Sequence, residues 1–167
     1  MIFVSHQLPV NVPGEPVLDR AAVWDGLVLK ANNALPFVPS MTYCEVTQRH
    51  GDTVFDRDID FRGERFTERI TLEQPHRVTF TRIAGPVLGT IANEIEGPDD
   101  DLKLRFSFAL VVTGVEGGSA AEQVFDVARQ EVIAGLLLPL SRDFCLGARE
   151  PGDPALPGKH FRTDREH

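Results

Sequence analysis

Cysteine is scarce in this chain of 167 residues, which has only Cys44 and Cys145. Two cysteines are too few for a disulfide framework or a thiolate-rich zinc site, so we expect a reduced compartment, the cytoplasm. Basic residues are also in short supply, because Lys and Arg number 17 against 25 Asp and Glu, giving a formal net charge of -8. An acidic chain repels phosphate backbones and anionic lipid headgroups, so we expect neither a nucleic-acid nor a membrane partner.

Long apolar runs are missing as well. No stretch approaches the roughly eighteen apolar residues of a membrane span, and the first residues lack the basic and apolar regions of a signal peptide. There is no His-Glu-x-x-His motif or His-x-His pair, and Asp99-Asp100-Asp101 lacks the Gly and distal Glu of a calcium loop. We therefore expect neither a metal nor a cofactor. What is present is a globular composition, 42% hydrophobic with eleven Phe, in a chain long enough for one domain.

The order of predicted elements is strand, helix, several strands and a second helix. A strand is predicted over residues 2–12, and Asp19 is the expected N-cap of an amphipathic helix over residues 20–32. Segments with period-two alternation then follow, separated by Gly- and Pro-rich turns, which predicts an antiparallel meander. From Ser119 the apolar period becomes helical, and Ser119 to Glu122 form a capping box at the start of one long helix.

These elements predict a single α+β domain over residues 1–147. The remaining residues, 148–167, combine several Pro and Gly with many charges, so they cannot bury enough apolar surface to order themselves. We expect this tail to be disordered.

The hairpin turns predict the register of neighbouring strands. A two-residue turn at Arg62-Gly63 sets Asp56 opposite Arg69 and Asp60 opposite Arg65 on one side of the sheet. Opposite charges that face each other in this way stabilise a strand pair. Apolar residues face each other on the other side, which is therefore the expected inner face.

The inner face also carries an ionic row. The same turn sets Arg57 opposite Glu68, the turn over residues 74–76 sets Glu68 opposite Arg82, and Gly89 opposite Arg82 is expected to leave open volume. Unpaired burial of such charges costs several kcal/mol. They must pair with one another, reach water or meet a ligand, and the sequence leaves both a self-satisfied row and a ligand pocket open. The expected apolar wall of that pocket is Phe55, Ile59, Phe66, Ile70, Phe80, Ile91 and Phe106.

Glu68 is the first candidate for a catalytic acid or base, because an apolar cavity disfavours the charged form of a carboxyl group. The positive charges of the flanking Arg57 and Arg82 favour the charged form of this carboxyl group. If both contact Glu68, it stays ionised, and the row is better suited to orienting a carboxylate, phenolate or enolate of a ligand.

Three further residues are candidates for contact with a ligand. Asn93 is expected opposite Phe106, where its amide meets a ligand carbonyl or is satisfied by the backbone. Tyr43, the only tyrosine, either supplies a phenol to the pocket or packs at its rim. Leu137 lies in the apolar part of the second helix, which either packs as helix core, lines the pocket or faces a second copy in a homodimer.

The element order resembles the helix-grip fold of the START-like superfamily, also called SRPBCC. Within residues 1–147, several stretches resemble the AtaL-like family, named for a member encoded in a fungal thiodiketopiperazine biosynthesis cluster. They are Pro36-Phe37-Val38-Pro39, Glu68 to Pro75, Asn93-Glu94-Ile95-Glu96 and Leu104-Arg105-Phe106. The resemblance implies a curved antiparallel sheet of about seven strands wrapped around a long C-terminal helix, with one or two short helices after the first strand.

The superfamily resemblance also implies a hydrophobic cavity between the sheet and the long helix, but no single chemistry. The leading hypothesis is a protein that binds a small hydrophobic metabolite, aromatic or anionic, in secondary metabolism. The alternative is a cofactor-free enzyme of polyketide cyclase, dehydratase or isomerase type that uses Glu68, Arg57, Arg82 or Asn93. A third interpretation, a structural domain whose own Phe side chains fill the cavity, also remains open.

Overall fold

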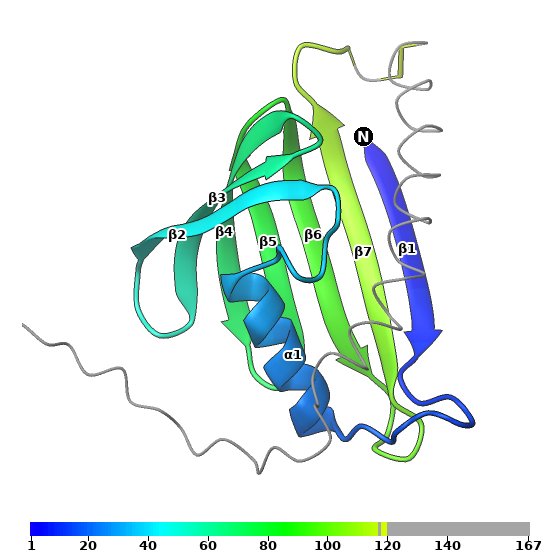
Figure 1. The fold of residues 1–167 in the computed structure, drawn as a ribbon. Coiled ribbons are helices and arrows are strands. Elements are labelled where there is room, and N and C mark those ends of the chain that lie inside the picture. Colours follow the sequence, from blue (N-terminus) through cyan, green and yellow to red (C-terminus); the bar gives the residue numbers. More distant parts are fainter. Residues whose placement is uncertain (117, 120–167) are drawn as a thin grey trace, which may run out of the picture.

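The structure is a computed structural model that describes residues 1–116, 118 and 119. In this part of the chain, seven strands form one sheet and one helix lies on one face of it (Figure 1). The strands are β1 (Ile2–Pro9), β2 (Met41–Arg49), β3 (Val54–Phe61), β4 (Glu64–Glu73), β5 (Arg77–Ala84), β6 (Val87–Glu96) and β7 (Lys103–Val112), and the helix is α1 (Arg20–Asn32).

Every strand pairs antiparallel with its neighbours, in the order β1-β7-β6-β5-β4-β3-β2. The first strand therefore returns to pair with the last, and β2 forms the opposite edge. The sheet is curved, and α1 packs against β5 and β6 on its concave side (Figure 1). The predicted curved sheet is confirmed, whereas the predicted long helix from Ser119 and the tail fall outside the described residues.

Helix α1 forms where the sequence predicts it. The carboxylate of Asp19 accepts a hydrogen bond from the backbone N–H of Ala22 at 2.8 Å, which satisfies one of the free donors of the first turn. Val23, Leu27 and Ala31, spaced four residues apart, are all buried against the sheet. The apolar stripe of α1 therefore determines which side of the helix faces the concave surface.

The predicted strand register is confirmed at each turn from which it was derived. The confirmed pairs include Asp56 with Arg69, Asp60 with Arg65, Arg57 with Glu68, Glu68 with Arg82, Asn93 with Phe106 and Arg82 with Gly89. On the outer face, Arg69 donates to Asp56 at 2.8 and 3.0 Å, and His50 lies 2.8 Å from the same carboxylate. These contacts lower the pKa of Asp56 to about 2, with the hydrogen bond from Arg69 as the largest cause.

Gly89 lies opposite Arg82 as predicted, but it does not leave open volume there. Its φ is +126°, and a Cβ atom would lie 2.1 Å from the carbonyl oxygen of Ala109 and 3.0 Å from the Cα of Leu110. The space beside Gly89 is filled by the backbone of β7. Glycine is required at this position because β6 and β7 approach each other closely.

We predict that Gly89→Ala lowers the free energy of unfolding by about 2 kcal/mol more than Gly51→Ala, measured by urea denaturation. Gly51 is the matched control, because its φ of +133° imposes a similar backbone strain while a Cβ atom there meets nothing within 4 Å. Equal losses in the two variants would show that β7 does not press against Gly89.

Candidate functional site

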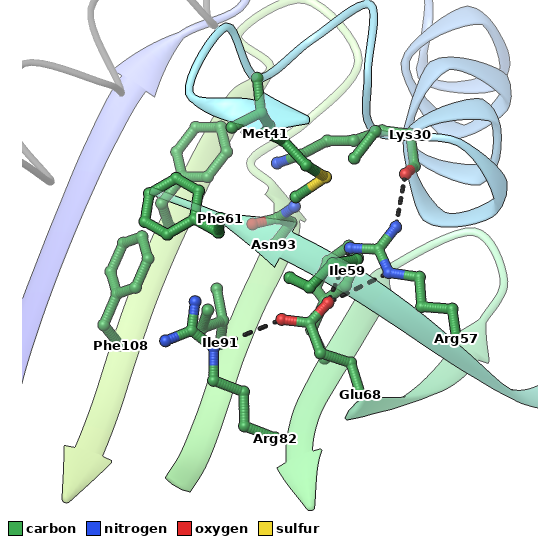
Figure 2. Close-up of a pocket in the computed structure, with 14 residues that line it drawn as sticks. Lys30, Met41, Arg57, Ile59, Phe61, Glu68, Arg82, Ile91, Asn93 and Phe108 are labelled. Carbon is green, nitrogen blue, oxygen red and sulfur yellow. Dashed lines mark hydrogen bonds and ion pairs between the residues drawn. The ribbon is translucent and has the colours of Figure 1, made fainter. Parts of the chain in front are cut away.

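A cavity of about 100 Å³ lies between the concave face of the sheet and the end of α1 (Figure 2). Its wall combines apolar side chains with four ionisable residues and one amide. Its described lining residues are Lys30, Ala34, Val38, Met41, Arg57, Ile59, Phe61, Glu68, Phe80, Arg82, Ile91, Asn93, Phe106 and Phe108. Cavities of roughly 150 Å³ hold a benzene molecule, so the space that the described residues enclose is about two thirds of that size.

Arg57 links the sheet to the last turn of α1. From β3, its Nη1 donates to the backbone carbonyls of Lys30 at 2.9 Å and Ala31 at 2.7 Å. These carbonyls belong to the last turn of the helix, where acceptors have no partner within the helix and a cation is favoured. The Nε and Nη2 atoms of Arg57 donate to one carboxylate oxygen of Glu68, at 3.1 and 2.8 Å. Four of the five N–H donors of Arg57 are thus used by the helix and by Glu68.

The other carboxylate oxygen of Glu68 accepts a hydrogen bond from a second arginine. Arg82 Nε donates to Glu68 Oε1 at 3.4 Å, and the Arg82 guanidinium lies 4.2 Å from the centre of the Phe66 ring. Among the described residues, the two terminal nitrogens of Arg82 have no hydrogen-bond partner, and Figure 2 shows them pointing away from Glu68, toward Phe108. Within the described part of the chain, Arg82 therefore directs its terminal N–H groups toward the cavity.

Lys30 was missed by the sequence analysis. It extends from the last turn of α1 into the cavity, where its Nζ lies 5.6 Å from the centre of the Phe80 ring and 5.3 Å from that of Phe106. With the amide of Asn93 oriented to satisfy both of its polar atoms, Lys30 Nζ donates to Asn93 Oδ1 at 3.1 Å. Burial, and secondly the charge of Arg57, lower the pKa of Lys30 to about 8, opposed by the smaller effect of Glu68.

A signal for Lys30 was present in the helical periodicity. It lies three residues after Leu27 and four before Ala34, on the same stripe of the helix as the buried apolar residues. A lysine on such a stripe either extends its amine past the core to water or places it in an internal cavity. In this structure, Lys30 places its amine in the cavity.

The ionisable residues of the cavity do not balance in charge. Among the described lining residues, Lys30, Arg57 and Arg82 face a single carboxylate, Glu68. Arg57 and Arg82 both contact that carboxylate, so the charge of Lys30 has no counterpart in this part of the chain. No fully buried side-chain nitrogen or oxygen of the described residues lacks a hydrogen-bond partner, so the row is satisfied in its hydrogen bonds but not balanced in charge. The positive balance of the described cavity favours an anionic group.

The structure brings together eight of the predicted site residues in the wall of the cavity. They are Ile59, Phe80, Ile91, Phe106, Asn93, Arg57, Glu68 and Arg82. Phe55, Phe66 and Ile70 lie on the inner face as predicted, but they are buried in the core beside the cavity instead of lining it. Leu137 lies outside the described residues.

Tyr43 does not belong to the cavity, which corrects the prediction that it supplies a phenol there. An irregularity in β2 between Met41 and Tyr43 shifts the alternation of side chains. Met41 and Cys44 consequently face inward, and Tyr43 faces outward. Its hydroxyl donates to Glu45, and the guanidinium of Arg65 lies 4.7 Å from the centre of its ring.

The described residues bear on two other types of site. They contain no group of three or more His, Cys, Asp or Glu that could hold a metal ion. In the same residues, no helix is long and apolar enough to cross a membrane.

Comparison with known proteins shows a family match. The model of the family described as "Acetylaranotin biosynthesis cluster protein L" (AtaL) matches residues 4–136. No curated protein matches the sequence.

Among solved structures, a Thermus thermophilus protein is similar with a TM-score of 0.65 and 15% identity, covering 89% of this chain and 99% of that one. The Zhui aromatase/cyclase from Streptomyces has a TM-score of 0.61 and 16% identity, covering 87% and 92%. A START superfamily protein from Mycobacterium smegmatis has a TM-score of 0.58 and 16% identity, covering 85% and 96%. At these identities the likeness establishes the fold and not the activity.

We predict that Glu68→Gln lowers the free energy of unfolding by about 3 kcal/mol, because it leaves two buried arginines without their shared carboxylate. Urea denaturation measures the loss. The matched control is Glu94→Gln, which removes a 30% exposed carboxylate that lies 3.4 Å from Arg77, and it should cost less than about 1 kcal/mol. Similar losses in both variants would contradict a structural role for the ionic row.

Proposed function

The chain belongs to the AtaL family, and from this premise we propose that it binds a small hydrophobic molecule carrying an anionic group in the cavity of Figure 2. The observation that carries the proposal is the excess of cationic side chains in an otherwise apolar wall. A small-molecule site of this kind typically has a hydrophobic lining and a few convergent polar groups that fix the orientation of the ligand.

Arg82 is the proposed anchor for the anionic group. Arg57 is already bound to α1 and Glu68, whereas Arg82 makes one hydrogen bond of 3.4 Å and keeps its terminal N–H groups toward the cavity. A guanidinium presents two parallel donors that match a carboxylate, and it can equally bind a phenolate or an enolate. Its side chain is only 8% exposed, so water competes weakly for these donors.

The apolar part of the ligand is proposed to lie against the aromatic side of the cavity, formed by Phe61, Phe80, Phe106 and Phe108. Ring faces and edges favour an aromatic or otherwise flat partner. Because the described cavity has about 100 Å³, one substituted ring fits better than a long acyl or polyketide chain, which needs several hundred Å³.

The second candidate function is that of a cofactor-free enzyme of cyclase, dehydratase or isomerase type, acting in secondary metabolism. Two observations favour it: one structural neighbour is an aromatase/cyclase, and the lowered pKa of Lys30 puts an acid or base near neutral pH in the cavity. Lys30→Met discriminates between the two functions better than Glu68→Gln, because Glu68 is also required by the fold. In an enzyme, Lys30→Met abolishes turnover of the bound molecule, whereas in a binding protein the loss appears in its affinity alone.

We predict that Arg82→Gln weakens the binding of benzoate, used as the probe, by about 10- to 100-fold, since a hydrogen bond to a charged group contributes about 1.5–3 kcal/mol. The affinity is measured by NMR titration or calorimetry. Binding of benzamide, which has the same ring and no charge, should change by less than about threefold.

The matched control for this experiment is Arg65→Gln, on the outer face, where Arg65 pairs with Asp60. It removes the same charge from the chain and should leave benzoate affinity unchanged. An equal loss in both arginine variants, or no binding of benzoate to the unaltered protein, would contradict the proposed function.

A further inference from the structure

We propose that Lys30 is a covalent attachment site, at which the amine forms a reversible imine with an aldehyde or ketone group of the ligand. This inference rests on the proposed function, because it requires that a ligand enters the cavity of Figure 2. It goes beyond that function by naming a second reactive group of the ligand, a carbonyl, beside the anionic group that Arg82 is proposed to hold.

The position of Lys30 is fixed from two sides. Its backbone carbonyl accepts the 2.9 Å hydrogen bond from Arg57, so the sheet holds the residue at its main chain. Its Nζ donates to Asn93 Oδ1 on β6 at 3.1 Å, and Asn93 is fully buried. The amine is thus positioned inside the cavity while two of its three N–H positions stay uncommitted among the described residues (Figure 2).

The surroundings of the amine suit a nucleophile. Only a neutral amine can attack a carbonyl, and lysines become neutral when they are desolvated or lie beside another cation. Both causes act here, through burial and through Arg57, while Glu68 acts weakly in the other direction. With its pKa lowered to about 8, a far larger share of the Lys30 amine is neutral at pH 8 than of an ordinary lysine, which is neutral to less than about 1%. The aromatic rings of Phe80 and Phe106 partly oppose this by favouring the cation.

The step is balanced without any further reagent. Nζ of neutral Lys30 attacks the carbonyl carbon, and the carbon–nitrogen bond forms as the electron pair of the C=O bond moves to oxygen. The oxygen takes up the two protons that nitrogen loses and leaves as one water molecule, so that a C=N bond remains. Addition of water reverses the step and releases the ligand with its carbonyl restored.

The ligand class that follows is a flat molecule with an anionic group and a carbonyl carbon. The anionic group pairs with Arg82, the ring lies against the aromatic wall, and the carbonyl meets Lys30. A formyl- or acyl-substituted aromatic acid has all three features on a single ring.

The probe for the test is 4-formylbenzoate, incubated with the full chain at pH 8 in the presence of cyanoborohydride, which reduces an imine to a stable secondary amine. The chain has three lysines, Lys30, Lys103 and Lys159, so peptide mass mapping assigns each adduct without ambiguity. We expect Lys30 to be labelled at least tenfold faster than either of the others, with benzoate slowing the reaction by competition.

Two variants separate the covalent step from binding. Lys30→Arg keeps the charge and should abolish the fast labelling, whereas Lys103→Arg, at an exposed site on β7, should leave it unchanged. Arg82→Gln should slow labelling by 4-formylbenzoate at least tenfold but not labelling by benzaldehyde, which has no carboxylate to anchor.

The failures of the two proposals are distinguishable. If benzoate binds and Lys30 is labelled no faster than Lys103, the imine is overturned and the binding function stands. If benzoate does not bind and all three lysines react at one common rate, both proposals are overturned.

Discussion

The guanidinium of Arg57 is the interaction on which the rest of the site depends. One side chain on β3 satisfies two carbonyls of the last turn of α1 and pairs with Glu68 on β4. Removing any member of such a buried group leaves the others unpaired, which costs several kcal/mol, so the helix, the sheet and the carboxylate are held as one unit. The end of α1, and with it Lys30, has a fixed place over the concave face.

Because Arg57 is committed in this way, the remaining cations of the cavity are the ones available to a ligand. Glu68 has one carboxylate for two arginines, and Arg82 donates to it only one hydrogen bond, the longer one of 3.4 Å. The amine of Lys30 lies among aromatic rings and contacts a neutral amide. A chain with a net charge of -8 thus encloses a locally positive cavity in its described part, which is a costly arrangement unless an anion enters it.

The register of the sheet was predictable because the turns and the positions of the charged residues indicate the same strand pairing. A two-residue turn at Arg62-Gly63 fixes all the pairs that follow, and the alternating charges of Asp56 and Asp60 against Arg69 and Arg65 give an independent check. The ionic row followed from the register alone.

The exact wall of the cavity was not predictable in the same way. Whether an inward residue lines a cavity or fills the core depends on where α1 lies, and Phe55 packs in the core that includes Trp24 and Leu27. The side chain of Tyr43 faces outward because the pairing of β2 is irregular between Met41 and Tyr43, and no residue pattern in the sequence indicates this irregularity. Lys30 lies on the buried stripe of α1, but whether its amine enters a cavity depends on the space between the helix and the sheet.

The most direct test of the central claim is a crystal structure of the protein soaked with 4-bromobenzoate, with the bromine located by anomalous scattering. The claim predicts a carboxylate within hydrogen-bond distance of the terminal nitrogens of Arg82 and a ring packed against Phe80, Phe106 and Phe108. A structure in which an acidic side chain of the protein itself occupies that position beside Arg82, with the probe absent from the cavity, would contradict it.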